Sequence, residues 1–293
     1  MVPCKVSFIS EGESCAALFY QSTNETAGCI VMAHGFAGIK EMRLKAYAHR
    51  FNQAGYHVLL FDYRHFGESE GDPRQLLDID KQHEDWRAAI AHIQTMDCID
   101  ADNVIVWGSS FSGGHVLKLA AENHSIAAVI SQVPHFFGLV SGLAGGLVHA
   151  SKLTMVGLVD QVRAMFGLSP FYIDVVGLPG DLAVMNRKGD YDGYMSLLPE
   201  KYPYCNKVAA RICLKAVFYN PGKYVKQIKV PILLQVGTKD ITTPPAPVLR
   251  AARSVPGNNV VVKTYKLGHF DVYVEPEFER IIEDQITFLD KYF

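Results

Sequence analysis

Short, almost uninterrupted apolar segments recur along the chain, and longer stretches with a different periodicity separate them. A run such as Val104-Ile-Val-Trp107 is typical of a strand that is buried on both faces of a parallel sheet. We therefore predict eight strands from such segments. These are Cys4–Ser10, Ala16–Tyr20, Cys29–Ala33, His57–Tyr63, Asn103–Trp107, Ala127–Val133, Pro231–Gly237 and Asn259–Tyr265.

Between these strands the apolar residues follow helical spacing. The i, i+3, i+4, i+7 pattern predicts a helix over 44–51, and Gly55 follows where such a helix would end. The same spacing predicts helices at 86–93, 116–120 and 278–289. Alternation of strands and helices predicts an α/β fold with a mostly parallel central sheet flanked by helices.

The alternation stops between residues 135 and 222. A stretch of this length cannot be a structureless loop in a compact domain. We interpret 135–222 as a mainly helical cap, without strand alternation, inserted after the sixth strand over the carboxyl edge of the sheet. Residues 1–134 and 223–293 then form the two parts of the core. Large apolar residues of the cap are expected to pack it onto the core and to line an apolar pocket, namely Phe136, Phe137, Leu139, Leu143, Met155, Met165, Phe166, Phe171 and Tyr172.

A run of small residues follows the predicted strand 103–107. Segment 108–112, Gly-Ser-Ser-Phe-Ser, has the order of strand, tight turn and helix that is typical of the nucleophile elbow G-x-S-x-G, with serine at the fifth position. We favour Ser110 as the nucleophile, because it lies two residues after the glycine that ends the strand. Ser112, two residues before Gly114, gives a second match to the pattern. A small-residue turn that only packs a helix onto a strand is the structural alternative.

A glycine-bearing loop follows the predicted strand Cys29–Ala33. Residues 32–38 read Met-Ala-His-Gly-Phe-Ala-Gly. Acyl transfer requires two backbone N–H groups that point at the oxyanion, and glycine lets a backbone approach closely. We predict that these donors are the N–H of Phe36 in this loop and the N–H of Phe111, which follows the nucleophile. An ordinary turn is the alternative for the loop taken alone.

Two polar residues follow the late strands. Asp240 comes just past the strand Pro231–Gly237, and His269 follows the next strand. Ligands gather at the carboxyl ends of parallel strands, so both side chains can reach the turn that holds Ser110. The three residues follow the order Ser, Asp, His of an α/β-hydrolase. Asp271 is an alternative acid, but its closeness to the histidine in sequence makes it poorly placed to orient the imidazole.

With these motifs the sequence resembles the α/β-hydrolase superfamily over nearly its whole length. More narrowly, it is similar to the branch of X-Pro dipeptidyl-peptidase-like and serine aminopeptidase-like hydrolases, which includes fungal polyketide-transferase-like proteins. Asp62 and Arg64 belong to one of the segments that carry this likeness, residues 62–71, and we interpret them as members of an ion-paired loop beneath the site. The segments are 34–42 (His-Gly-Phe-Ala-Gly-Ile-Lys-Glu-Met), 62–71 (Asp-Tyr-Arg-His-Phe-Gly-Glu-Ser-Glu-Gly) and 268–273 (Gly-His-Phe-Asp-Val-Tyr).

The motifs and the resemblance together predict a serine hydrolase of the carboxylesterase or thioesterase type. His269 would take the proton of Ser110 as its oxygen attacks the carbonyl, Asp240 would orient the imidazole, and water would release the acyl group. The same triad would serve an acyltransferase, polyketide transferase or cyclase, for example in secondary metabolism. A non-catalytic binding protein on a hydrolase scaffold is the other alternative. The expected partner is a small hydrophobic acyl substrate.

Composition narrows the remaining classes. Lys and Arg number 28 against 30 Asp and Glu, so the chain has no basic field for nucleic acid. No P-loop is present and the pattern at His83-Glu84 lacks its second histidine, so we predict neither metal nor cofactor. Six cysteines without a C-x-x-C pair, and no signal-peptide pattern, predict a cytoplasmic protein. The apolar stretch Gly138–Leu158 contains His149 and Lys152, which argues against a membrane span. A homodimer is one expected oligomeric state.

Overall fold

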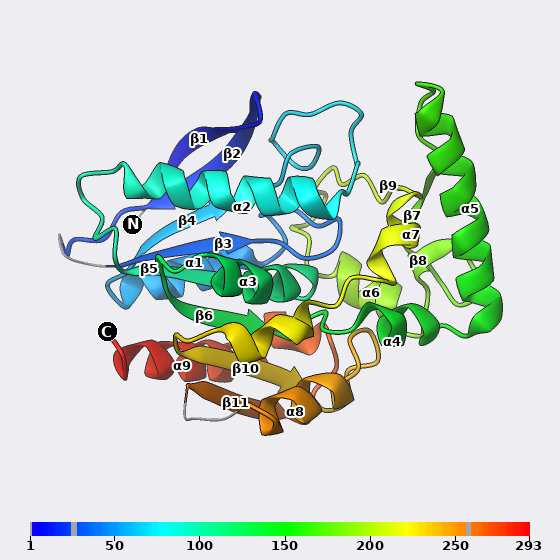
Figure 1. Cartoon of the computed structure of the whole chain (residues 1–293). Coiled ribbons are helices and arrows are strands. Elements are labelled where there is room, and N and C mark those ends of the chain that lie inside the picture. Colours follow the sequence, from blue (N-terminus) through cyan, green and yellow to red (C-terminus); the bar gives the residue numbers. More distant parts are fainter. Residues whose placement is uncertain (1, 25–27, 256–258) are drawn as a thin grey trace.

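A mixed sheet forms the centre of the computed structural model, which describes residues 2–24, 28–255 and 259–293. Its strands are β1 (Cys4–Ser10), β2 (Glu13–Tyr20), β3 (Cys29–Ala33), β4 (His57–Phe61), β5 (Val104–Ser109), β6 (Ile126–Gln132), β10 (Ile232–Gly237) and β11 (Val260–Tyr265). They lie in the order β1-β2-β4-β3-β5-β6-β10-β11 (Figure 1). The pairs β1–β2 and β2–β4 are antiparallel, and all other neighbours are parallel.

Helices cover both faces of this sheet. They are α1 (Leu44–Gln53), α2 (Ile79–Gln94), α3 (Phe111–Glu122), α8 (Ala246–Arg253) and α9 (Glu277–Asp290). Helices α1 and α9 lie together on one face, where the rings of Tyr47 and Phe278 meet edge to face at 4.8 Å. Helices α2 and α3 lie on the other face (Figure 1). The predicted α/β class, with a mostly parallel sheet between helices, is confirmed.

The central strands are buried because helices cover both of their faces. Every residue of β3, β4 and β5 is buried, which explains the uninterrupted apolar segments in the sequence. Polar groups in this core have partners. The indole N–H of Trp107 donates to Oε1 of Gln285 over 3.0 Å, and the Trp107 ring lies 5.1 Å from that of Tyr47.

The predicted and observed elements differ mainly at their ends. Strand β5 continues through Ser109, past the last apolar residue. Helix α2 starts at Ile79, well before the first residue that shows helical apolar spacing. Asp78 explains this earlier start, because its carboxylate accepts hydrogen bonds from the N–H groups of Asp80 and Lys81 as an N-cap.

Segment 135–222 lies beyond the carboxyl edge of the sheet, on the right in Figure 1. Its elements are α4 (Gly138–Leu143), α5 (Leu147–Met165), β7 (Tyr172–Val176), β8 (Ala183–Met185), α6 (Asp190–Met195), β9 (Val208–Ala209), α7 (Ile212–Ala216) and the start of the 3₁₀ helix η1 (Pro221–Gln227). Helices dominate, and β7, β8 and β9 add a small sheet that the sequence pattern did not indicate. These strands have two to five residues, too few to produce a recognisable alternation.

Helix α5 contains much of the apolar stretch 138–158. It also carries Lys152, Asp160 and Arg163, and Asp160 is paired with Arg211 of the same segment at 2.7 Å. Across the described part of the chain, no helix combines the length and the apolar character that crossing a membrane requires. All six cysteines are free thiols.

Candidate active site

Ser110 lies in the tight turn between β5 and α3. Its φ of 58° and ψ of −119° are strained for a residue with a side chain. The turn requires Gly108, because a Cβ there would lie 2.2 Å from the carbonyl oxygen of Ser112. Ser110 N–H donates to the carbonyl of Gln132 over 2.9 Å, and Ser110 C=O accepts the N–H of His135 over 2.8 Å. These two bonds hold the turn at the carboxyl edge of the sheet.

Ser112, the other candidate from the sequence, lies below this edge. Its side chain is fully buried, and its hydroxyl is 2.5 Å from the hydroxyl of Tyr63. The indole N–H of Trp86 donates to the same tyrosine oxygen over 2.7 Å. Ser112 is therefore enclosed in a polar contact of the core, whereas Ser110 is partly exposed.

His269 and Asp240 lie beside Ser110 in the predicted order. His269 Nε2 is 2.9 Å from Ser110 Oγ, and His269 Nδ1 is 2.7 Å from Asp240 Oδ2. The Asp240 carboxylate also accepts the N–H groups of Thr242 and Thr243 at 2.8 and 2.7 Å. The carboxylate accepts the Nδ1 proton, so Nε2 is left free to accept the proton of the serine hydroxyl.

Asp271, the alternative acid, points elsewhere. Its carboxylate accepts the backbone N–H of Gly268 over 2.8 Å and so closes the turn that precedes His269. The structure brings Asp240, and not Asp271, into contact with the imidazole.

Phe36 and Phe111, the predicted oxyanion donors, lie side by side next to the nucleophile. Their rings meet edge to face with centroids 5.4 Å apart. A Cβ on Gly35 would be 3.0 Å from Ser110 Cβ, so the glycine lets this loop pass close to the serine. The N–H of Phe111 is the first of α3 and has no intrahelical acceptor. Within the described residues, neither phenylalanine N–H donates a hydrogen bond to another group of the chain.

Ion pairs support the loops beneath this site. Buried Asp62 accepts hydrogen bonds from the backbone N–H and the Nζ of Lys40 at 2.7 and 2.6 Å. Burial disfavours the charged ammonium of Lys40, but Asp62 and Glu68 outweigh it and raise its pKa. Arg64 Nε is 2.6 Å from Asp85 Oδ1. These contacts agree with the interpretation of Asp62 and Arg64 as structural.

Three imidazole rings, whose association the sequence did not indicate, form a cluster behind Phe111. His83 and His115 contact the hydroxyl of Tyr219 at 3.0 and 2.7 Å, and the ring of His135 stacks on that tyrosine. Burial lowers the pKa of His83 to about 3 and that of His135 to about 4, so both rings are neutral at pH 7. No local pattern links these residues, because they come from α2, α3 and two loops.

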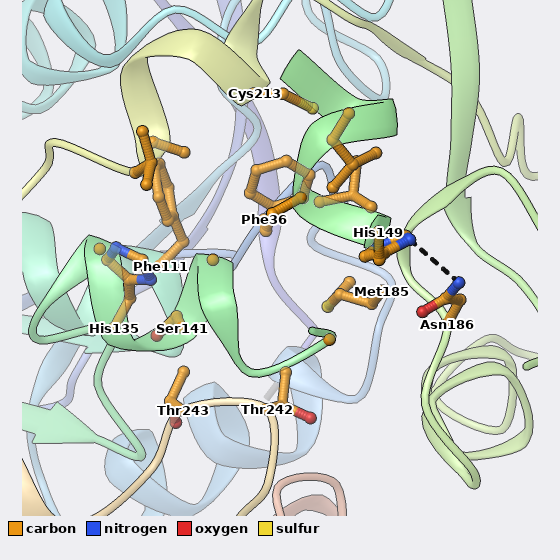
Figure 2. A pocket seen from close by; sticks show the side chains of 18 of the residues that line it. Phe36, Phe111, His135, Ser141, His149, Met185, Asn186, Cys213, Thr242 and Thr243 are labelled. Carbon is orange, nitrogen blue, oxygen red and sulfur yellow. Dashed lines mark hydrogen bonds between the residues drawn. The ribbon is translucent and has the colours of Figure 1, made fainter. Parts of the chain in front are cut away.

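Two cavities meet at Ser110. The larger is lined in part by residues of α4, α5 and α7, and several of its lining side chains are labelled in Figure 2. The smaller is bordered by His269. Ser110, Phe36 and Met185 border both cavities. Leu153, Val217, Cys213 and His135 are among the residues that line the larger one. Met42, Leu44, Leu197 and Phe270 are among those that line the smaller one.

The nine large apolar residues named in the sequence analysis were expected to pack the cap onto the core and to line the cavity. None of the nine named from segment 135–222 borders either cavity. Met155, Met165 and Phe166 are instead 68%, 74% and 74% exposed. Helix α5 turns Ala150, Leu153 and Thr154 toward the cavity, so its helical period directs most of its larger side chains to solvent.

Known proteins are similar to this chain in sequence. The family model described as serine aminopeptidase, S33, matches residues 24–154. The quorum-quenching protein AidA of Acinetobacter baumannii is 43% identical over 290 residues, which cover 99% of this chain and 95% of that protein. The polyketide transferase af380 of Aspergillus fumigatus is 26% identical over 269 residues, which cover 90% of this chain and 89% of that protein.

Solved structures show the same fold. The α/β hydrolase GrgF of Penicillium sp. sh18 matches with a TM-score of 0.84 and 21% identity, covering 100% of this chain and 99% of that one. The chain belongs to the α/β-hydrolase superfamily, within the branch of serine aminopeptidase-like hydrolases that also holds polyketide-transferase-like proteins. Relatives named for transferase activity support an enzymatic function for this chain.

Proposed function

We propose that this chain is a serine hydrolase that cleaves an ester or thioester of a hydrophobic acyl substrate. The observation that carries the proposal is the continuous contact from Ser110 Oγ through His269 to Asp240, at 2.9 and 2.7 Å. It links a hydroxyl, a proton acceptor and a carboxylate at the border of two cavities, which is the arrangement that acyl transfer requires.

The proposed reaction has two halves. Ser110 Oγ attacks the carbonyl carbon while His269 Nε2 takes the hydroxyl proton, and the N–H groups of Phe36 and Phe111 stabilise the oxyanion. His269 then gives this proton to the leaving oxygen or sulfur, which departs as an alcohol or thiol. Water, deprotonated by the same nitrogen, attacks the acyl-enzyme, and the proton returns to Ser110 as the carboxylic acid leaves.

The two cavities support an assignment of the two ends of the substrate. The leaving atom must lie close to His269 Nε2, and His269 borders only the smaller of these two cavities. The alcohol or thiol therefore occupies the smaller cavity, and the acyl chain extends into the larger one. Apolar walls such as Leu153, Val217 and Met185 favour a hydrocarbon chain there.

Acyl transfer is the second candidate. A relative named as a polyketide transferase favours it, because the same acyl-enzyme can be attacked by an acceptor other than water. The acceptor would approach along the path of the departing group, through the smaller cavity. Product analysis with and without added alcohols, thiols or amines distinguishes the two: only a transferase forms more acylated acceptor than free acid.

Labelling with a fluorophosphonate tests the serine-dependent class. The wild-type chain should be labelled, and Ser110→Ala should not. Equal labelling of both variants would contradict the proposed nucleophile.

Hydrolysis of an ester and thioester series of rising acyl length, with amides as a contrast, tests the substrate class. We expect kcat/KM to rise with added methylenes. Leu153→Trp narrows the larger cavity and should shift the preference to shorter chains, with little change for acetyl esters. A maximum at acetyl, or at free-amino peptides, would contradict the apolar acyl site.

A further inference from the structure

Two tyrosines of segment 135–222 contact the loop that carries the N–H of Phe36. The hydroxyl of Tyr194, in α6, lies 3.0 Å from the carbonyl oxygen of Phe36. The hydroxyl of Tyr204 lies 2.8 Å from the carbonyl oxygen of Ala37. The two hydroxyls are themselves 2.8 Å apart. The cap segment therefore bonds directly to the backbone of the oxyanion loop.

The hydroxyls of Tyr194 and Tyr204 have one proton each, whereas the contacts described above, two to the loop carbonyls and one between the hydroxyls, number three. Burial raises the pKa of both Tyr194 and Tyr204, so both keep their protons. When both protons point at the loop, each loop carbonyl is held. When one proton bridges the two oxygens instead, one of the carbonyls loses its donor. Each tyrosine therefore supports a different peptide group of the loop.

The peptide group that contains the Phe36 N–H is fixed from its other side. The carbonyl of Gly35 accepts the N–H of Gly38 over 3.3 Å and contacts Nδ1 of His34 at 3.0 Å. Burial lowers the pKa of His34 to about 4, so the ring is neutral at pH 7 and its proton lies on Nδ1, the nitrogen that faces an acceptor. Three consecutive carbonyls, those of Gly35, Phe36 and Ala37, thus have donors.

The backbone needs this support. Ala37 has a φ of 49°, in the left-handed region that is unfavourable for a residue with a Cβ. A loop strained in this way keeps its conformation only where its surroundings hold it. The hydrogen bond from Tyr204 to the Ala37 carbonyl acts at the strained residue itself.

Helix α6 is also fixed against the other loops of the site. The carboxylate of Asp190 accepts the hydroxyl of Thr242 at 2.9 Å, in the loop that follows Asp240. Gly193 packs against Phe270, since a Cβ at this glycine would lie 2.4 Å from the phenylalanine ring. Tyr194 is therefore held in a defined position relative to all three loops.

We propose that Tyr194 and Tyr204 are positioning residues for the oxyanion hole. They orient the backbone on the carboxyl side of Phe36, so that its N–H points at the oxygen of the tetrahedral intermediate. The inference rests on the proposed function and adds to it: segment 135–222 sets the rate of the chemical step as well as the shape of the cavity.

Tyr194→Phe and Tyr204→Phe test this, because each removes one hydroxyl and keeps the ring. We expect kcat for the preferred p-nitrophenyl ester to fall about tenfold in each, less than for loss of an oxyanion donor itself, with KM changed less than twofold. The inhibition constant of a trifluoromethyl ketone with the same acyl chain, which forms a tetrahedral oxyanion on the serine, should rise about tenfold. A purely structural role would lower the melting temperature without moving this constant.

Tyr202→Phe is the matched control. Tyr202 is a partly buried tyrosine of the same segment, and in the described part of the chain its hydroxyl makes no hydrogen bond, so wild-type kinetics are expected. Equal kcat and inhibitor affinity in wild type and both test variants would overturn the inference while leaving the proposed function intact. If either Tyr194→Phe or Tyr204→Phe does not fold, the kinetics of the other variant test the inference. Ser110→Ala separates the two claims: wild-type turnover by that variant would overturn the proposed function and this inference with it.

Discussion

The sheet-forming core and segment 135–222 use their apolar residues in opposite ways. In the core, every position of β3, β4 and β5 is buried between two helical layers. In the segment, helix α5 packs through one side, and its residues Met155 and Met165 are 68% and 74% exposed. A strand that is covered on both faces requires an apolar residue at nearly every position. A helix at the edge of the molecule is covered on one side and tolerates apolar residues on either side.

The two regions also contribute differently to the site. The proposed nucleophile, imidazole, acid and two oxyanion N–H groups all come from the core, from turns and helix starts that follow β3, β5, β10 and β11. The segment supplies most of the wall of the larger cavity, through α4, α5 and α7. Changes at the site residues and buried positions of the core should therefore abolish the chemistry or the fold. Changes in the segment should alter specificity, slow the reaction at Tyr194 and Tyr204, or leave the protein unaffected.

The largest effect is expected for the core nucleophile. Ser110→Ala should lower kcat/KM by more than 10³-fold, because it removes the atom that forms the acyl-enzyme. Circular dichroism should show an unchanged fold. Ser112→Ala is the matched control and should keep most of the activity, since the Ser112 hydroxyl is buried against Tyr63, away from His269. The reverse result would assign the nucleophile to Ser112.

The second-largest effect is expected for Asp240→Asn, which should reduce kcat about 10²- to 10³-fold and change KM little. The amide would no longer favour the proton on Nδ1 of His269, so Nε2 could not accept the serine proton. Asp271→Asn is the comparison, because its carboxylate contacts the turn at Gly268 and not the imidazole. A larger loss in Asp271→Asn would transfer the acid role to that residue.

Substitutions in the core and in segment 135–222 should also differ in their effect on the free energy of unfolding. Leu60→Ala, at a fully buried position of β4, should lower the free energy of unfolding by about 3 kcal/mol, through lost burial and the cavity that remains. Met155→Ala on the outer side of α5 should change it by less than about 0.5 kcal/mol. Urea unfolding of both variants measures this difference. An equal loss for Met155→Ala would mean that the outer side of α5 is covered in solution.

The smallest effect concerns the boundary between the regions, where the ring of His135 stacks on Tyr219 of the segment and contacts the tilted ring of Phe111 of the core. Burial lowers the pKa of His135 to about 4 from an ordinary value of 6.5. Between these values the unfolded chain binds a proton that the folded chain does not, so stability falls as the pH decreases below 6.5. One such group accounts for about 2 kcal/mol between pH 7 and pH 5.

Urea unfolding at the two pH values, for wild type and for His135→Phe, measures this contribution. The variant keeps an aromatic ring between Phe111 and Tyr219 but has nothing to titrate, so its loss of stability at pH 5 should be smaller. An identical pH dependence in both proteins would show that His135 gains its proton equally well in the folded state.

Sequence patterns predicted the core well because its constraints are local. Apolar runs indicate strands covered on both faces. Ser110, Asp240 and His269 each follow a predicted strand, so they lie at one edge of the parallel sheet, and the structure brings these three side chains into contact. Segment 135–222 lacks such constraints. Its strands are short, and its contacts with the oxyanion loop join residues 158 and 167 positions apart, which no local pattern contains.

The strand order has a consequence for how activity arises during folding. The groups of the site follow β3, β5, β10 and β11, and the last two strands are separated from β6 in sequence by the whole of segment 135–222. Pairing of strands so distant in sequence is slow, because the long loop between them loses conformational entropy before the strands make contact. The nucleophile turn can form long before its partners arrive. Recovery of turnover after dilution from denaturant would therefore lag behind the return of helical signal, and hydrolysis would report the last strand pairings of the sheet.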